Sequence, residues 1–490
     1  MRGDLEDMGM LKSITLENYK CFKKLEDLEI KPLTILCGVN SSGKSSILKS
    51  LLMLKQSYSS FSNSNSLSIN GDYTNNGMFK DVVNGGKGSL FKIQNSFEIK
   101  ESTYNTTQEK NTLKEINDMF HCERRTIRYV KLDVEICVKS QNRKIISYGD
   151  NTIDQITIIL SSKPNYKLFI NFSHIQDRKY NIVVKGLPTI QKDKVELIDT
   201  VCHFDGLKVS NLFFDHVVPN QNVNEVLAAI YTVFRIISLQ YKDIYYISPL
   251  RSAPQRRYVI EQDIENIGIY GEYVPQILEK YKEVNGRIND IPNNDLFSIN
   301  FSTTHLKAKD AVNKWLKYFG VDTLNIYPTD ELLRINIGEH NILDVGFGIS
   351  QALPIIVNGV TLPFETTLLL EQPEVHLHPR MQMSMADLLI AISMAHKNVI
   401  IETHSDHIIN RVSRRMMENE YIRKNTSIKF VDKDINGHSF VDSIQVDPIR
   451  GIITNNENFF REFASETEKI IRAGYENKIK VKKDGNYTFR

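Results

Sequence analysis

The sequence has few cysteines and no long hydrophobic run. Its five cysteines are an odd number without any C-x-x-C spacing, which argues against a disulfide framework and a zinc ribbon. The longest apolar run, Val226 to Leu239, is about 14 residues and contains Arg235, so it is shorter than the roughly 20 residues of a membrane helix. The first residues also lack the apolar stretch of a signal peptide. These absences predict a cytoplasmic protein with no membrane partner.

An excess of charge of one sign is also missing. The formal net charge is only +2, so any binding to nucleic acid would need a local basic patch. The apolar fraction of 41% and the charged fraction of 24% are those of an ordinary globular protein. At 490 residues the chain exceeds what one core usually fills, which predicts two or three structural units or one domain with a large insertion.

What the sequence does contain is a phosphate-binding motif between a strand and a helix. Residues 38–45 match G-x-x-x-x-G-K-[ST] without a mismatch, after an apolar strand and before a helical pattern from Lys44 to about Gln56. Backbone amides of such a loop surround phosphates, the lysine reaches the β and γ phosphates, and the final hydroxyl ligates Mg²⁺. The predicted ATP-binding residues are Gly38, Asn40, Ser41, Ser42, Gly43, Lys44, Ser45 and Ser46.

A carboxylate follows a second apolar strand. The run Thr367 to Leu370 ends in Glu371, and open α/β sheets bind their ligands at the carboxyl ends of the strands. Glu371 is therefore predicted to hold Mg²⁺ together with Ser45. Many buried strands end in an acid, so the prediction depends on the order of the motifs.

Strands alternate with helices around these motifs, which predicts a mostly parallel sheet covered on both faces. After Glu371, an amphipathic helix reaches about His396, and the strand Val399–Ile401 leads to Thr403. The middle of the chain instead shows short β-like runs, namely Tyr129–Val138, Gln155–Leu160 and Tyr180–Val184, with no repeat and no recognisable chemistry. We therefore expect an α/β core interrupted by a large mixed α+β insertion.

The motifs together resemble those of the ABC-type ATPases of the RecF, SMC and OLD-like group, in particular standalone AAA-type ATPases of bacterial defence and genome-maintenance loci. Residues 14–22 are similar to that group's opening I-x-L-x-N-Y-K-x-F strand, and residues 346–351 to its signature loop. Residues 371–379 resemble its extended Walker B motif and D-loop, and residues 403–405 its switch-histidine loop. The likeness covers about residues 11–60 and 340–447.

The resemblance implies a P-loop ABC-type ATPase head. The expected units are an ATPase lobe with the P-loop at 1–95, an insertion at 96–330, a second lobe with the signature, Walker B and switch histidine at 331–450, and an extension at 451–490. It also implies an ATP-dependent homodimer, or a higher oligomer, in which Ser350 caps the ATP held by the other chain. His404 would sense the γ-phosphate; the alternative is a capping or core histidine.

The sequence departs from this family at Gln372, where better-known members have a catalytic glutamate. A glutamine can position water but cannot accept its proton, so it cannot be a general base. Glu374 is the alternative base. Phosphoryl transfer depends mainly on positioning and electrostatics, so we expect slow hydrolysis, with Glu371, Gln372, Glu374 and His404 as the catalytic set.

Two basic segments leave alternatives open. Arg251 lies in a Pro-bounded loop and is either a phosphate contact or part of a solvated turn. Arg411, Arg414 and Arg415 have the spacing of one helix face, which suits either an anion or DNA patch or a solvated face.

Three functions compete. The first is a dimeric ATPase that acts on double-stranded DNA or controls a separate effector nuclease, as relatives do in anti-phage defence. The second is an ATP-dependent assembly scaffold with negligible hydrolysis, which Gln372 keeps open. The third, a small-molecule kinase, would leave the signature loop and the switch histidine without a role. No nuclease constellation follows residue 405, so any cutting would come from another chain.

Overall fold

The computed structural model describes residues 10–59, 67–86, 89–100, 107–120, 127–140, 151–162, 166–176, 179–191, 194–198, 207–210, 213–215, 223–288, 290–292, 306–329, 331–454, 456, 458 and 459. Most of the predicted C-terminal extension lies outside these residues, as do Cys122 and Cys202. The three cysteines that are described, Cys21, Cys37 and Cys137, are free thiols. No helix in the described part of the chain is long and apolar enough to cross a bilayer.

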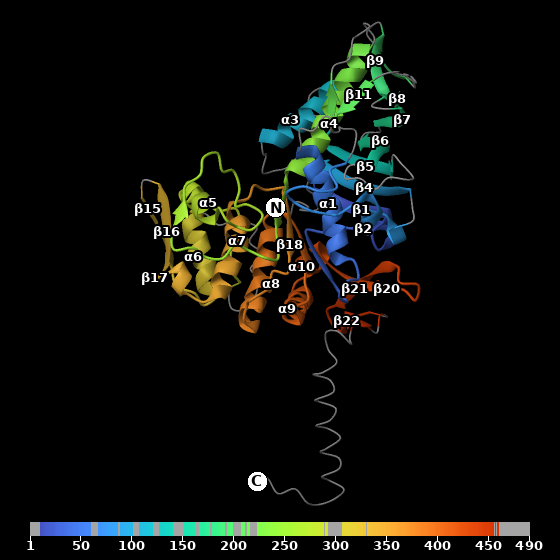
Figure 1. Ribbon diagram of the computed structural model, residues 1–490. Coiled ribbons are helices and arrows are strands. Elements are labelled where there is room, and N and C mark those ends of the chain that lie inside the picture. The colour runs from blue at the N-terminus through green and yellow to red at the C-terminus, as the bar shows by residue number, and fades with distance from the viewer. Residues whose placement is uncertain are drawn as a thin grey trace, which may run out of the picture.

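The P-loop strand lies inside a mostly parallel sheet (Figure 1). Over the described residues this sheet has seven strands, in the spatial order β13 (Ile244–Ile247), β18 (Thr367–Glu371), β19 (Asn398–Glu402), β3 (Leu33–Gly38), β20 (Thr426–Lys433), β21 (Ser439–Asp447) and β22 (Gly451–Ile453). The first five strands are parallel, and β21 and β22 extend the edge in antiparallel pairing. Strands β3, β18 and β19 are buried along their whole length, which explains their continuous apolar sequences.

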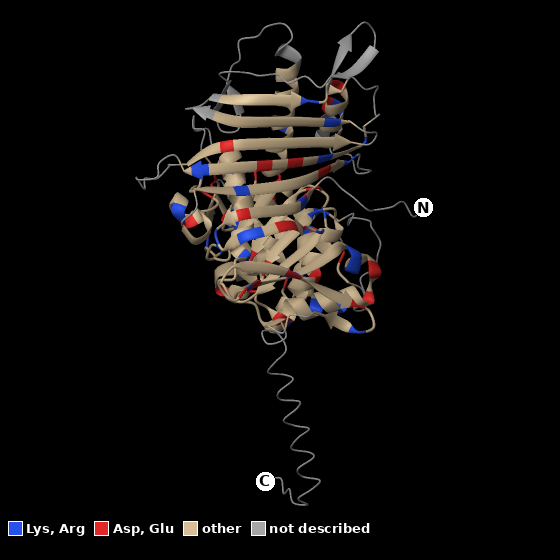
Figure 2. Cartoon of the chain, turned by 90° about the vertical axis from the view of Figure 1, so that its right-hand side faces the viewer, with Lys and Arg blue, Asp and Glu red and all other residues tan. Residues whose placement is uncertain are grey.

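A second, antiparallel sheet joins the N-terminal strands to strands of the middle region. Its nine strands in the described part of the chain run in the order β12 (Phe213–Asp215), β11 (Leu207–Ser210), β8 (Lys179–Lys185), β7 (Lys167–Gln176), β6 (Asn151–Ser162), β5 (Tyr129–Ser140), β4 (Leu90–Lys100), β1 (Leu11–Tyr19) and β2 (Phe22–Glu29). Figure 2 faces this sheet and shows basic and acidic residues mixed along its strands.

The remaining strands of the described part of the chain form two smaller sheets. One pairs β9 (Leu187–Gln191) with β10 (Lys194–Ile198). The other contains β14 (Tyr258–Val259), β16 (Leu332–Ile337), β15 (Leu324–Pro328) and β17 (His340–Asn341). Leu332–Ile337 therefore belongs to this smaller sheet rather than to the sheet that carries the P-loop.

Helices separate and cover the two large sheets. Their bounds are α1 Lys44–Ser59, α2 Phe79–Val82, α3 Thr107–Met119, α4 Val223–Lys242, α5 Val274–Tyr281, α6 Ala308–Tyr318, α7 Phe347–Thr361, α8 Pro379–Met394, α9 Asp406–Glu418 and α10 Glu420–Asn425. The apolar run Val226–Leu239 forms most of α4, which packs against α1.

The alternation of side chains along the parallel strands divides the core into two clusters. Leu36, Leu369 and Ile400 join a cluster with α1, α4 and the antiparallel sheet. Leu368 and Ile401 point the other way, into a cluster with α5 to α9. Both faces of the parallel sheet are therefore covered, as predicted.

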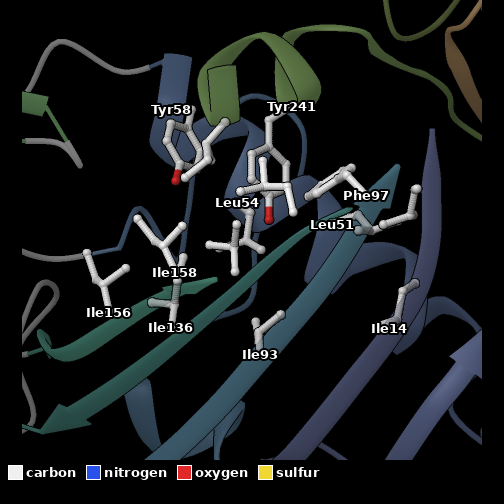
Figure 3. Packing of buried hydrophobic residues seen from close by; sticks show 14 of the residues in the cluster. Ile14, Leu51, Leu54, Tyr58, Ile93, Phe97, Ile136, Ile156, Ile158 and Tyr241 are labelled. Carbon is white, nitrogen blue, oxygen red and sulfur yellow. The ribbon is translucent and has the colours of Figure 1, made fainter. Parts of the chain in front are cut away.

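Aromatic residues pack the layer between the sheets (Figure 3). Tyr58 of α1 stacks on Tyr241 of α4 with ring centroids 4.8 Å apart, and Phe97 of β4 meets the Tyr241 ring edge-on at 5.5 Å. Isoleucines of the antiparallel sheet, including Ile93 and Ile136, lie beneath them. This packing fixes α1, and hence the loop that precedes it, against both sheets.

Candidate active site

The loop between β3 and α1 has a backbone that requires its glycines. Gly38 and Gly43 have φ values of 132° and 111°, and Ser41 between them has φ 58°. A Cβ atom on Gly38 would lie 2.1 Å from the carbonyl oxygen of Val431, and one on Gly43 would lie 2.3 Å from the Cys21 sulfur. Gly38 cannot be replaced without moving the main chain of β20, and a side chain at Gly43 would displace the Cys21 side chain.

The predicted nucleotide-binding residues differ in exposure. Asn40 and Ser41 are exposed at the tip of the loop, Ser45 and Ser46 are half-buried, and Ser42 is buried. Lys44 is only 3% exposed, and its Nζ donates hydrogen bonds to the carbonyls of Gly38 and Val39, at 2.9 and 2.7 Å. The ammonium group thus lies within the loop that the motif predicts to hold phosphates.

Two buried carboxylates end adjacent strands beside the loop. Glu371 ends β18 and Glu402 ends β19, and the two residues are direct partners in the parallel ladder. The Ser45 hydroxyl, at the start of α1, lies close enough to Glu402 to lower the pKa of its carboxyl group. Burial raises the pKa of Glu371, and the Glu402 carboxylate raises it further, whereas the Tyr246 hydroxyl and Lys49 lower it. Burial also raises the pKa of Glu402, which Ser45, Lys44 and Lys49 oppose.

Two residues from the middle region reach this site: Tyr246, which the sequence did not indicate, and Arg251, for which it left two alternatives. The Tyr246 hydroxyl at the end of β13 donates to Glu371 Oε1 at 2.9 Å, and burial raises the pKa of this phenol. Arg251 is 6% exposed and donates to the main-chain carbonyls of Glu371 and Gln372, at 3.0 and 3.2 Å. Burial lowers the pKa of Arg251 to about 10, so it keeps its charge at neutral pH. The solvated-turn alternative for Arg251 is therefore wrong, and its contacts are with the main chain.

The main chain at Gln372 is strained and fixed. Its φ is 46°, which is uncommon for a residue with a side chain. Its N–H donates to the carbonyl of Glu402 at 2.7 Å, and its own carbonyl accepts from Arg251. The peptide after Glu371 is therefore held from two sides, which fixes the point from which the Gln372 side chain starts.

Glu374 connects this segment to the switch loop. Its Oε1 accepts the main-chain N–H of His404 at 2.7 Å. Burial raises the pKa of Glu374. Burial, and then the charge of Lys44, lower the pKa of His404, so its imidazole is mainly neutral at pH 7. The N–H of Thr403 donates to the carbonyl of Leu36 in the P-loop strand at 3.0 Å, so the switch loop lies beside the P-loop.

The comparison with protein families identifies this arrangement. Residues 10–409 match the AAA ATPase domain family, which is most of the chain. The chain belongs to this family. It is therefore an ATP-binding ATPase, with the P-loop geometry that such a protein requires. No curated protein matches the sequence.

Solved structures similar to this AAA ATPase include SMC head domains. One, from Thermotoga maritima, has 11% identity and a TM-score of 0.35, with 89% of this chain and 100% of that chain covered. A second, derived from Pyrococcus furiosus and bound to the C-terminal domain of ScpA, has 13% identity, a TM-score of 0.39 and coverages of 89% and 97%. A third, bound to the C-winged helix domain of ScpA, has 11% identity, a TM-score of 0.37 and coverages of 89% and 98%.

The signature segment of this AAA ATPase packs on its own Walker B segment. A Cβ on Gly348 would lie 2.7 Å from the His376 carbonyl oxygen, and the Phe347 ring meets the His376 ring edge-on at 5.0 Å. Ser350 is 7% exposed, and its hydroxyl donates to the Phe347 carbonyl at 2.7 Å. The role of Ser350 across a dimer interface stays a prediction, and in the single chain its hydroxyl bonds to a carbonyl of its own helix.

The three arginines of α9 do not form a patch. Arg415 is 1% exposed, and with Arg411 it donates to the fully buried carboxylate of Asp387 on α8. Arg414 points elsewhere and pairs with Glu418 at 2.6 Å. Both expectations for this helix face, a DNA patch and a solvated face, are therefore wrong for Arg411 and Arg415, because Asp387 draws them into the core.

The residues present fit ATP with Mg²⁺. Glu402 Oε2 and the Ser42 hydroxyl are buried without a hydrogen-bond partner in the described part of the chain. No group of three or more His, Cys, Asp or Glu side chains that could hold a metal occurs among the described residues. A hydroxyl and one or two carboxylates suit Mg²⁺, which takes its remaining ligands from phosphates and water.

Proposed function

We propose that this ATPase is an ATP-occupancy switch that hydrolyses ATP slowly and controls a separate effector. The observation that supports this most is Gln372, which stands beside Glu371 on a fixed main chain where relatives have a general base. The other parts of a phosphoryl-transfer site lie around it, namely the P-loop, the buried carboxylates and the switch loop. The site therefore has the residues needed to bind ATP, but it has no general base beside Glu371 to take a proton from the attacking water.

Each residue of the site has a role in this proposal. The loop amides and Lys44 bind the phosphates, and Ser45 and Glu371 would hold Mg²⁺, which when bound neutralises phosphate charge. Gln372 orients a water molecule without taking its proton. Glu374 positions His404 through the main chain, so that the imidazole faces the γ-phosphate as a sensor.

We further propose that ATP holds two copies of the chain together. The N-terminus of α7 begins at an exposed Gly346, and two exposed apolar side chains flank it, Phe347 at 44% and Leu343 at 42% exposure. Main-chain amides at a helix N-terminus attract a phosphate, and exposed apolar side chains favour burial against a partner. A second copy that presents these groups to the γ-phosphate would complete the site.

The charges of the chain favour a protein as the partner of this ATPase over DNA. The net charge is +2, and Asp387 occupies the two arginines that the sequence offered as a DNA patch. The resemblance to ATPases of bacterial defence loci suggests an effector nuclease on a separate chain. A scaffold with negligible hydrolysis is the second candidate, and Gln372 is the observation that favours it.

Mass photometry combined with phosphate release tests this function. The wild-type chain should associate with ATP, dissociate slowly as phosphate appears, and remain monomeric with ADP. Association that persists with no phosphate release would favour the scaffold. Association that is indifferent to nucleotide would contradict the switch.

A further inference from the structure

Two acidic side chains lie next to each other at the nucleotide site. Glu371 and Glu402 are paired residues of adjacent parallel strands, and they are 8% and 5% exposed. Paired residues of a parallel ladder point to the same side of the sheet. Two carboxylates buried together are unfavourable unless each finds a donor or a cation.

The two carboxylates differ in what they contact. Glu371 Oε1 accepts the Tyr246 hydroxyl at 2.9 Å, on the side away from the P-loop strand. Glu402 lies beside the Ser45 hydroxyl, and its Oε2 is buried without a hydrogen-bond partner among the described residues. The sheet order explains this difference, because β19 lies between β3 and β18 and so brings Glu402 nearer to the P-loop.

We propose that Glu402 is a metal-holding residue of this site, in the coordination shell of the nucleotide's Mg²⁺ beside Ser45, with Glu371 as the second carboxylate. The inference rests on the proposed ATP site and adds a residue to it. Mg²⁺ accepts one or two carboxylates together with phosphate oxygens, and the unpartnered Glu402 oxygen is available for this. A glutamine at position 402 could still bond to Ser45 but would bring no charge to the metal.

The test separates metal binding from nucleotide binding in the full chain. Binding of the non-hydrolysable analogue AMP-PNP is measured by calorimetry in EDTA and at increasing free Mg²⁺, for the wild type, Glu402→Gln, Glu371→Gln and the control Glu339→Gln. Glu339 is an exposed residue between β16 and β17. We expect Glu402→Gln to bind the analogue normally in EDTA but to need about tenfold to one-hundredfold more Mg²⁺ for half-saturation. The control should match the wild type. Mn²⁺ binding followed by electron paramagnetic resonance should weaken in parallel.

The contradicting outcomes are distinct. If Glu402→Gln binds the analogue and needs no more Mg²⁺ than the wild type, Glu402 serves only to anchor Ser45, and the inference is wrong while the ATP site stands. If the wild type binds no nucleotide, the proposed function fails and the inference with it. If Glu402→Gln does not fold, Glu402→Asp provides the test, because it keeps the charge but shortens the reach. Its Mg²⁺ requirement should then rise less, and an unchanged requirement would also overturn the inference.

Discussion

At the scale of single residues, we expect Gln372 to limit how fast this ATPase turns over. Its main chain is already fixed by Glu402 and Arg251, so a substitution of the side chain should leave the loop in place. A carboxylate at this position would lie beside the attacking water. It would also lie near Glu371 and Glu402, whose negative charges oppose a third one.

We predict that Gln372→Glu raises ATP turnover. A positioned general base contributes on the order of 10²-fold, and repulsion from the neighbouring carboxylates reduces this gain. Steady-state phosphate release measures the change. The same substitution in a Lys44→Ala background should show no turnover, which controls for contaminating ATPases.

The variant Glu374→Gln tests whether Glu374 is the general base or only positions the switch loop. If Glu374 takes the proton, its substitution should stop turnover, and Gln372→Glu should bring no gain. The hydrogen bond of Glu374 to the switch loop favours a positioning role, in which Glu374→Gln lowers turnover only partly, since an amide oxygen can still accept from His404. A wild type without turnover that Gln372→Glu does not rescue would support the scaffold.

The sequence predicted some site residues and missed others for a physical reason. Lys44 and Ser45 were predictable because a P-loop is local, with its strand, turn and helix contiguous in the chain. Glu402 and Tyr246 were not predictable, because their places depend on which strands become neighbours. For the same reason the sequence left two alternatives open for Arg251. The one signal for Glu402 was an acid at the end of a buried strand, directly before the switch loop.

At the scale of helices and strands, a buried polar cluster ties α8 to α9. The Asp387 carboxylate accepts hydrogen bonds from Arg411, Arg415 and Tyr318 at 2.6 to 3.1 Å. Helix α8 follows the Walker B segment, and α9 begins directly after the switch loop. The cluster therefore fixes the two helices that lead away from Glu374 and His404.

We predict that Asp387→Ala lowers the stability of the fold by about 3–5 kcal/mol, because it leaves buried arginine charge without a partner. Urea denaturation followed by circular dichroism should show a lower midpoint. The exposed pair Glu420–Lys424, whose side chains are 68% and 64% exposed, provides the control. Glu420→Ala should cost at most about 1 kcal/mol. Equal midpoints for the two variants would contradict this account of the cluster.

The sequence predicted where helices and strands form better than it predicted which of them pack together. The strands at 129–138, 155–160 and 180–184 and the helix after Lys44 form as predicted, because their apolar periodicity is a local property. The sequence did not show that these three strands join β1 and β2 in one sheet, because strand pairing depends on contacts between residues distant in the chain. The helical spacing placed Arg411 and Arg415 on one face. It could not show that this face points toward the core, because their partner Asp387 lies on another helix.

At the scale of the whole molecule, the proposed switch needs a second copy of the chain to complete the ATP site. We predict that Ser350→Arg leaves the ATP affinity of the monomer nearly unchanged but blocks ATP-dependent association. The bulky cation would occupy the start of α7, where the partner's nucleotide should dock. Light scattering with a non-hydrolysable ATP analogue measures the association.

A second variant allows for the burial of Ser350. Gly346 is exposed, and a Cβ there would meet no atom within 4 Å, so Gly346→Asp should fold normally. Its carboxylate would repel the γ-phosphate at the end of the helix, and we expect it to block association as well. Dimers that form in both variants without dependence on nucleotide would count against a shared ATP site.

The central claim is that ATP binds at the loop between β3 and α1, and calorimetric titration of the full chain with ATP and Mg²⁺ tests it most directly. Lys44→Ala removes the ammonium that lies within the loop, and Lys23→Ala, at an exposed position of β2, is the matched control. We predict that the wild type and Lys23→Ala bind ATP equally and that Lys44→Ala, though folded, shows no binding. The same ATP affinity in Lys44→Ala as in the wild type would contradict the account.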